Sequence, residues 1–254
     1  MKSLTAVLMF AFAVSYSAAA ELVADGFSAP TGIAFDSQGN MYVSNWSGGS
    51  VIKVSADGRK SIFVSNLGSP SGLAFDKRGT LYVADYKQSI YKVTPDGNKS
   101  ILTDKLKTPT GISFAKNGSL LVANRSSNEI ASISMDGKIN IVANVLKTPV
   151  GAVETNDGTV YATNYGGGIS IIRNGKVSAI TDGFSTPGVG ITTDEKNNVY
   201  AVDYSDGAVK QIMKDGMVTT VADGFKSPVA LTYYSGSLYV GTWGDGSIFR
   251  INIQ

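Results

Sequence analysis

Short apolar segments alternate with turn residues along the whole chain, and the alternation repeats about every forty residues. Each repeat opens with a proline, continues with a strand-like segment such as TGIAF and, after a turn, reaches a second one such as NMYVSNW. A third segment runs to an Asp-Gly or Asn-Gly turn, and a fourth leads to the next proline. The opening prolines are Pro30, Pro70, Pro109, Pro149, Pro187 and Pro228, at intervals of 40, 39, 40, 38 and 41 residues.

This period is typical of a β-propeller, in which each blade is a sheet of four strands. The Tyr, Val and Leu residues of the second segments suit a half-buried pleated surface. The Asp-Gly pairs tolerate the positive φ that tight hairpins need. No apolar run with a helical period occurs after the first twenty residues. The sequence therefore predicts an all-β protein, a six-bladed β-propeller with four antiparallel strands in each blade, in one domain that spans residues 21–254.

The two ends of this domain are predicted to share one blade. The repeat that opens with Pro228 has room for only three strands before Gln254. The segment ELVADGF at residues 21–27 matches the fourth-strand segment VTTVADGF at residues 218–225. We therefore expect the N-terminal strand to complete the last blade beside residues 248–253, which would cover an edge that otherwise favours aggregation.

The first twenty residues have the pattern of a secretory signal peptide. Lys2 supplies the charged start, residues 4–14 the apolar stretch, and three alanines at 18–20 a small-residue cleavage site. The predicted mature protein is therefore periplasmic or secreted, and its lack of cysteine means that no disulfide stabilises it there. Cleavage would remove one lysine from a formal charge of +2. The near-neutral balance gives no support to nucleic-acid or membrane binding, and we expect a monomer.

The repeat also carries a family resemblance. The pattern P-x-G-(I/L)-x-F, then LYVAD with a following aromatic residue, then IxKV and DG, resembles the NHL-repeat propellers. It is similar to the broader superfamily of the regucalcin/gluconolactonase group, the strictosidine-synthase-like proteins and the streptogramin lyases. The resemblance covers the whole predicted mature chain and implies the propeller fold. It does not imply one function, because this superfamily includes binding modules and several unrelated enzymes.

The resemblance implies that ligands bind at the face that carries the loop before the first strand and the loop after the second. Three rings of residues are expected there. The first lies just after the opening prolines: Thr31, Ser71, Thr110, Val150, Val189 and Val229. The second ends the second strands: Asn45, Asp85, Asn124, Asn164, Asp203 and Thr242. The third follows at once: Trp46, Tyr86, Arg125, Tyr165, Tyr204 and Trp243.

These rings favour a binding surface, with a structural alternative for each. Aromatic faces beside amides and hydroxyls suit a small molecule, a glycan or a peptide. The short polar side chains of the second ring would alternatively cap the turns that follow them. The aromatic residues of the third ring would alternatively pack between neighbouring blades.

The residue types argue against the catalytic chemistry of the superfamily. The chain has no histidine, which removes the Ser-His-Asp triad and the His-dependent chemistry of the streptogramin lyases. The calcium enzymes of the regucalcin/gluconolactonase group place acidic or amide residues at several first-ring positions, and this chain has none there. Asp85 and Asp203 belong to opposite blades, too far apart to share an ion. We expect no catalytic residue, no metal and no cofactor. A divergent hydrolase of the lactonase type is the alternative.

One carboxylate stands where four other repeats have an aromatic residue. Glu154 occupies the strand position of Phe35, Phe75, Phe114 and Tyr233. A charge there needs a partner or a shifted pKa. The sequence leaves two interpretations open: a structural hydrogen bond, or an acid that faces the central channel.

Overall fold

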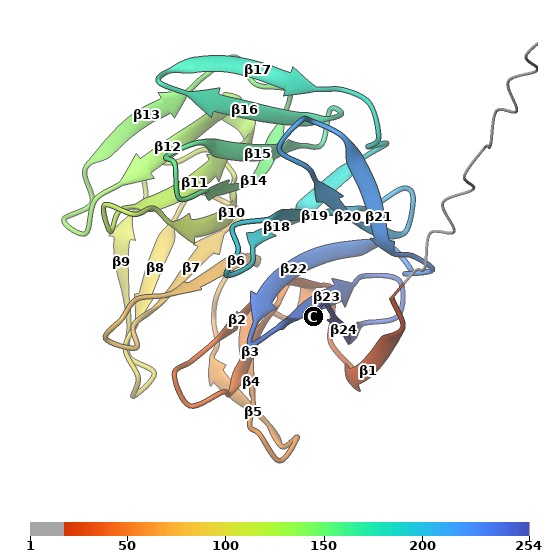
Figure 1. Cartoon of the computed structure of the whole chain (residues 1–254). Coiled ribbons are helices and arrows are strands. Elements are labelled where there is room, and N and C mark those ends of the chain that lie inside the picture. The colour runs from red at the N-terminus through yellow and green to blue at the C-terminus, as the bar shows by residue number, and fades with distance from the viewer. Residues whose placement is uncertain (1–17, 254) are drawn as a thin grey trace, which may run out of the picture.

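The computed structural model describes residues 18–253 as six four-stranded antiparallel sheets arranged around a central axis (Figure 1). The predicted fold class is confirmed. Blades 1 and 2 contain β2 (Pro30–Phe35), β3 (Met41–Asn45), β4 (Ser50–Val54) and β5 (Lys60–Val64), then β6 (Pro70–Phe75), β7 (Leu81–Asp85), β8 (Ile90–Val93) and β9 (Lys99–Thr103). Blades 3 and 4 contain β10 (Pro109–Phe114), β11 (Leu120–Asn124), β12 (Glu129–Ile133) and β13 (Ile139–Ala143), then β14 (Pro149–Glu154), β15 (Val160–Asn164), β16 (Ile169–Arg173) and β17 (Lys176–Ile180).

Blades 5 and 6 complete the ring. They contain β18 (Pro187–Thr193), β19 (Val199–Asp203), β20 (Ala208–Ile212) and β21 (Val218–Ala222), then β22 (Pro228–Tyr234), β23 (Ser237–Thr242), β24 (Ser247–Asn252) and β1 (Ala20–Ala24). The described helical elements are two single turns, η1 (Trp46–Gly48) and η2 (Arg125–Ser127), both directly after a second strand. Within the described residues, no helix has the length and apolar character needed to cross a membrane.

The N-terminal strand closes the ring as predicted. β1 pairs antiparallel with β24, with Glu21 opposite Arg250 and Leu22 opposite Phe249. The guanidinium of Arg250 donates a hydrogen bond to the Glu21 carboxylate over 2.6 Å. Phe27 then packs with core residues of blades 1 and 6. The first and last described strands are therefore held in one sheet. Of the predicted signal peptide, residues 1–17 lie outside the described residues, so that segment stays a prediction.

Apolar side chains fill the spaces between neighbouring blades. Between blades 1 and 2, Tyr42 meets Phe63 and Phe75 edge to face, with ring centroids 4.9 and 4.8 Å apart. Leu81 and Val83 of the next blade are completely buried in the same cluster. Because each cluster draws residues from two blades, the blades stabilise one another, and no blade has a closed core of its own.

Glycines on the innermost strands let the blades approach closely at the axis. A Cβ atom at Gly32 would lie 2.3 Å from the carbonyl oxygen of Ser71, and one at Gly151 would lie 2.1 Å from that of Val189. Either contact is a clash, so only glycine fits. The space left along the axis beside these glycines is about 40 Å³. The channel is therefore almost closed, and it gives the mouth of the propeller a floor.

A hydroxyl–aspartate contact recurs in turns of the propeller, in blade 4 between β14 and β15 and in blade 1 between β4 and β5. The Thr155 hydroxyl donates to Asp157 over 2.7 Å and the Ser55 hydroxyl donates to Asp57 over 2.6 Å. The hydroxyl hydrogen bond, followed by that of the Thr159 amide, lowers the pKa of Asp157 to about 2. The pKa of Asp57 is also lowered, chiefly by the Ser55 hydroxyl. Both carboxylates are thus stabilised in the charged form.

We predict that removing the closing strand leaves a propeller that does not fold cooperatively. Deletion of residues 21–28 exposes the edge of β24 and removes Phe27 from the core between blades 6 and 1. We expect soluble yield to fall sharply and thermal unfolding, followed by circular dichroism, to become broad. Glu21→Gln, which removes only one exposed ion pair, is the matched control and should unfold as the wild type does. An unchanged unfolding transition in the deletion variant would contradict the closure.

Acid should destabilise the propeller through its turn aspartates. A carboxyl whose folded pKa lies below its unfolded value of about 3.9 contributes stability that is present above that value. The contribution is lost as the pH falls through the folded pKa, which for Asp157 is about 2. We therefore expect the Tm, measured by circular dichroism, to decrease from about pH 4 to pH 2.

The variants Asp157→Asn and Asp104→Asn separate this effect from general acid denaturation. Asp157→Asn should lower the Tm at pH 6 and flatten its decrease in acid, because one titrating group is lost. Asp104→Asn replaces an exposed aspartate in another loop and should leave the decrease of Tm with falling pH unchanged. The same decrease of Tm with falling pH in both variants would contradict the contribution assigned to Asp157.

Candidate ligand-binding site

Two of the three predicted rings come together in one cavity at the mouth of the propeller. The first and third rings line a space of about 300 Å³, with all six blades contributing. Its lining residues are Thr31, Ser71, Thr110, Val150, Val189 and Val229 from the first ring, and Trp46, Tyr86, Arg125, Tyr165, Tyr204 and Trp243 from the third. Gly188, the residue inserted in the fifth repeat, also lines the cavity. Gly188 separates Pro187 from the first-ring residue Val189, whereas in the other five repeats the ring residue follows the proline directly.

Backbone hydrogen bonds fix the third ring against the loop before each first strand. The amide of Trp46 donates to the carbonyl of Ala29, and that of Arg125 donates to Thr108, over 3.2 and 3.1 Å. The same bond recurs in the other four blades. Ala29 and Thr108 adopt left-handed φ values of 56° and 61°. Residues before proline usually avoid this region, so the loops hold a strained backbone at the cavity rim.

The floor of the cavity is polar on one side and apolar on the other. Blades 1 to 3 present the hydroxyls of the first ring, and blades 4 to 6 present its valines. Thr31 donates to the Ala29 carbonyl over 3.0 Å, and Thr110 donates to the Ala123 carbonyl over 3.2 Å. Ser71 is 1% exposed, and its hydroxyl has no hydrogen-bond partner among the described residues. A buried hydroxyl without a partner costs free energy that a ligand would recover.

The wall of the cavity is a continuous series of aromatic contacts. The Trp46 ring lies 5.7 Å from the ring of Trp243 and 5.7 Å from that of Tyr86, centroid to centroid. The indole nitrogen of Trp243 donates to the Thr31 hydroxyl over 3.2 Å, which joins the wall to the floor. Trp243 is 39% exposed and Tyr165 is 49% exposed. These two rings retain much open surface, so inter-blade packing alone does not account for them.

Arg125 is the charged member of the wall. Its guanidinium carbon lies 5.8 Å from the Tyr86 ring and 5.6 Å from the Tyr165 ring, within the range of cation–π attraction. One of its nitrogens donates to the Tyr86 hydroxyl over 2.5 Å. The aromatic neighbours on either side therefore hold the guanidinium at the cavity.

The second ring lies behind the cavity, across from the opening prolines. In each blade its residue pairs with the proline, as Asn45 does with Pro30. Its side chain then accepts amides of the loop: Asn45 from Ser28 over 2.5 Å, Asp85 from Gly68 over 2.8 Å, and Asn124 from Lys107 over 2.7 Å. In the turn after the second strand, which the sequence left as the capping alternative, Asp85 accepts the amide of Lys87 over 3.2 Å. The contacts from Ser28, Gly68 and Lys107 lie instead in the loop before the first strand. They support the loops that carry the site.

Of the remaining second-ring residues, two form hydrogen bonds within their own blades and Asp203 supports the loop before β18. Asn164 donates to the Ser170 hydroxyl over 2.9 Å, and Thr242 donates to the Ser247 carbonyl over 3.1 Å. Asp203 is completely buried and accepts the amides of Ser185 and Thr186, over 2.7 and 3.0 Å. The geometry thus gives the six residues a supporting role, and direct contact with a ligand stays a prediction for them.

A buried lysine in blade 5 was missed by the sequence analysis. Lys210 donates to Asp203 over 2.9 Å, to the Gly183 carbonyl over 2.7 Å and to Asp206. Burial alone would lower the pKa of Lys210, but the hydrogen bonds to Asp206 and Asp203 outweigh it and raise the pKa. The lysine stands where β4 has the apolar Ile52, and that contrast was the available signal. Its charge neutralises that of the buried Asp203, and its hydrogen bond to the Gly183 carbonyl fixes the loop before β18.

Glu154 lies at the end of β14 that is away from the cavity. Its carboxylate accepts the backbone amide of Lys116 from the neighbouring blade over 2.7 Å. Of the two interpretations that the sequence left open, this contact is the structural hydrogen bond.

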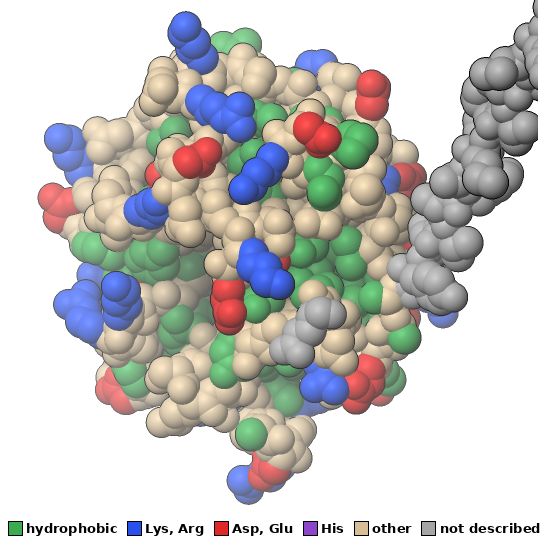
Figure 2. Space-filling view, viewed as in Figure 1, with side chains coloured by type: hydrophobic (Ala, Val, Ile, Leu, Met, Phe, Trp, Pro, Cys, Tyr) green, Lys and Arg blue, Asp and Glu red, His purple; other side chains and the backbone are tan. Residues whose placement is uncertain are grey.

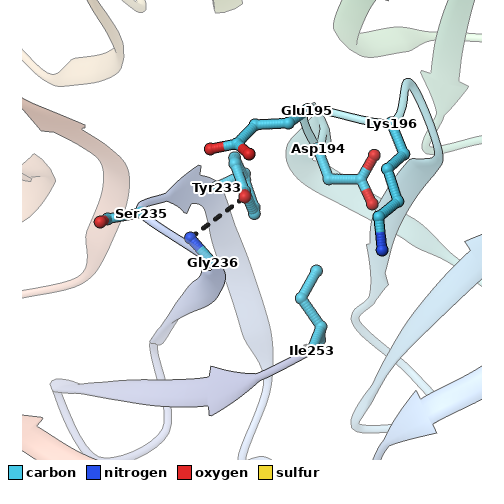
Figure 3. A pocket seen from close by; sticks show the side chains of 7 residues that line it. All are labelled: Asp194, Glu195, Lys196, Tyr233, Ser235, Gly236 and Ile253. Atoms are coloured by element: carbon cyan, nitrogen blue, oxygen red, sulfur yellow. Dashed lines mark hydrogen bonds between the residues drawn. The ribbon is translucent and has the colours of Figure 1, made fainter.

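A second cavity of about 400 Å³ lies on the same side as Glu154, where the turn after β18 faces the turn after β22 (Figure 3). Asp194 there already accepts both the amide and the side chain of Asn198, over 2.8 and 2.7 Å. The Tyr233 hydroxyl accepts the Gly236 amide over 3.1 Å, and Ser235 points away from the cavity in Figure 3. The polar groups in this cavity do not converge on one point, as a binding site requires.

Charged side chains do not define a site of their own. Lysine, arginine, aspartate and glutamate are interspersed on the face shown in Figure 2, with apolar patches between them. Within residues 18–253, no group of three or more histidine, cysteine, aspartate or glutamate residues could hold a metal ion. The channel-mouth cavity is therefore the candidate functional site.

The fold and this cavity define a six-bladed propeller with an aromatic-lined cavity over a nearly closed channel. The chain belongs to the virginiamycin B lyase family, whose sequence model matches residues 17–254. A search of curated proteins found no match.

Solved structures share the fold at low sequence identity. A catalytically inactive histidine-to-alanine variant of virginiamycin B lyase from Staphylococcus aureus, with quinupristin, is 18% identical, with a TM-score of 0.70 over 93% of this chain and 88% of that one. A gluconolactonase from Xanthomonas campestris is 16% identical, with a TM-score of 0.82 over 93% of this chain and 90% of that one. A chain of the nidogen/laminin complex is 19% identical, with a TM-score of 0.73 over 83% of this chain and 88% of that one.

Proposed function

We propose that this protein is an exported, non-catalytic propeller that binds a small molecule, a glycan or a peptide in the aromatic cavity at the channel mouth. The observation that carries the proposal is the convergence of twelve first- and third-ring residues on one cavity of about 300 Å³. The volume is at the lower end of the range for small-molecule sites, about 300–1,000 Å³. An aromatic wall with a few polar groups below it is the usual composition of such a site.

The non-catalytic part of the proposal comes from the residues of the chain. It has no histidine, whereas the relative with quinupristin was inactivated by replacing one. A protein without histidine has to use another general base. The cavity lining contains no carboxylate either, and Arg125 is its one charged residue. Family membership supports a ligand site at this face, and the missing residue types argue against the lyase reaction.

A hydrolase of the lactonase type is the second candidate. It is favoured by the likeness to the Xanthomonas gluconolactonase, which has the highest TM-score of the three neighbours described above. The first ring of this chain supplies only hydroxyl and valine side chains, which are poor ligands for calcium.

The two tryptophans allow the binding proposal to be tested directly. The chain contains two tryptophans, and both line the cavity, so their fluorescence reports its occupancy. We expect a screen of small molecules, oligosaccharides and short peptides to give a saturable change in tryptophan emission. Trp46→Ala and Trp243→Ala should each weaken binding of the ligand found about tenfold or more, measured by calorimetry.

A matched truncation on the outer surface controls for general effects. Ile62→Ala removes a side chain that is 67% exposed on β5 and should leave affinity unchanged. The Tm of both tryptophan variants should stay close to that of the wild type. Intact affinity together with a large loss of stability would show that these rings are core and that the proposed site is wrong.

A calcium titration separates the binding protein from the lactonase alternative. A calcium site would raise the unfolding temperature as the ion concentration increases, because only the folded state binds the ion. We expect the Tm, measured with EGTA and with millimolar calcium, to be the same. A concentration-dependent rise, together with hydrolysis of gluconolactone, would favour the enzyme.

A further inference from the structure

We infer that Arg125 and Ser71 form an anion-binding subsite in the cavity, and that the ligand is a small organic acid with a flat aromatic or branched apolar body. The inference rests on the proposed function of the cavity and names the ligand class. The anionic end, a carboxylate or a sulfonate, lies over blades 2 and 3, and the apolar body lies over blades 4 to 6.

Arg125 has the properties of an anion receptor. It is the one charged residue that lines the cavity, and it forms no ion pair within residues 18–253. A guanidinium has five N–H donors, and the one side-chain hydrogen bond that Arg125 makes there goes to the neutral hydroxyl of Tyr86. The rings of Tyr86 and Tyr165 stabilise its charge without neutralising it. Donors therefore remain for a ligand, in a mainly apolar space where a charge-assisted hydrogen bond is strong.

Ser71 supplies an independent observation. Ser71 lines the cavity floor on the next blade and is 1% exposed, and its buried hydroxyl has no hydrogen-bond partner in the described chain. The equivalent hydroxyls of Thr31 and Thr110 are both engaged with backbone carbonyls. Ser71 is thus a donor without an acceptor, and an anionic oxygen would provide the acceptor.

The charged residues around Arg125 also favour an anionic ligand. Lys107 and Lys147 are exposed in the loops next to Arg125, where their carbonyls accept the amides of Ser126 and Gly166. The acidic residues of the rim are occupied elsewhere. Asp206 pairs with Lys210, and Asp245 accepts the Thr242 hydroxyl. Over blades 3 and 4, the Glu129 carboxylate accepts the Asn124 side chain over 3.2 Å. Arg125, Lys107 and Lys147 outnumber this carboxylate, so that side of the mouth has a positive balance of charge.

The other half of the cavity selects an apolar body. Val150, Val189 and Val229 form the floor there, and the half-exposed rings of Tyr165 and Trp243 stand above it. These groups offer dispersion contact and few hydrogen bonds, so a glycan with hydroxyls on every side would lose hydrogen bonds to water. An organic acid with one charged end fits both halves of the cavity.

Two dyes that differ by one charge test this inference. 8-Anilinonaphthalene-1-sulfonate and N-phenyl-1-naphthylamine share an aromatic body, and only the first is an anion. Both fluoresce when they bind, and energy transfer from Trp46 and Trp243 identifies the dye in the cavity. In the full-length protein we expect Arg125→Gln to weaken the sulfonate about tenfold and to change the neutral amine less than about twofold. Ser71→Ala should act in the same direction with a smaller change.

The controls separate a local contact from net charge and from misfolding. Arg78→Gln removes one positive charge from an exposed turn at the other end of blade 2 and should leave both dyes unaffected. Arg125→Lys keeps the charge and should restore part of the sulfonate affinity. Salt from 50 to 500 mM should weaken the sulfonate more than the amine.

Each outcome supports or overturns a defined statement. A fall in sulfonate affinity that is confined to the Arg125 and Ser71 variants supports the subsite. Unchanged sulfonate affinity in Arg125→Gln, or an equal loss for both dyes, overturns the anion subsite while the cavity proposal stands. Binding of neither dye to the wild type, with no energy transfer from the tryptophans, overturns the subsite and the inferred ligand class. The proposed function is overturned separately, if the screen of small molecules, oligosaccharides and peptides gives no saturable change in tryptophan emission.

Discussion

The structure depends on how closely six backbones approach at the axis, which the missing Cβ atoms of the inner-strand glycines allow. At Gly32, Gly72, Gly111, Gly151 and Gly190, a side chain of any size would meet the backbone of the next blade. With these contacts the channel is almost closed, and the first ring forms a floor. If the blades lay farther apart, the same residues would line an open hole. The cavity therefore has its floor because these five positions carry no Cβ atom.

Of two consecutive residues at the end of each second strand, the first supports a loop and the second lines the cavity. Asn45 is turned toward the loop and holds its amides, while Trp46, the next residue, faces the cavity. The same division recurs at Asp85 and Tyr86. The supporting residue accepts hydrogen bonds that the loop backbone would otherwise leave unmade, so the rim keeps its shape without a ligand. A substitution at the cavity-facing position, such as Trp46, would then alter the cavity and leave the hydrogen bonds of the loop in place.

The sequence predicted the fold and the composition of the cavity wall because both follow from a repeat. Forty-residue spacing determines the blades, and the incomplete last repeat determines the closure by β1. The spacing also predicted the end of the propeller at which the three rings lie. It did not predict whether each side chain faces the cavity or the loop behind it. Neighbouring residues at a strand end point in opposite directions, so Asn45 and Trp46 look equivalent in a repeat and differ in the structure. The hydrogen bonds of Lys210 and the unpartnered Ser71 hydroxyl were not predicted, because each depends on three-dimensional contacts in one blade. For Lys210, the contrast with Ile52 indicated an unusual position but not its partners.

The divided floor has a consequence for how a guest molecule is oriented. A ring with six identical positions would offer six equivalent poses, and their mixing would contribute about 1 kcal/mol of entropy to binding. In this chain three residues with hydroxyls are followed by three valines, so the six positions are not equivalent and a bound molecule would have one preferred direction. The chain thus gives up a small entropic gain for polarity across the axis. A propeller made of similar repeats would thus distinguish the two ends of one bound molecule.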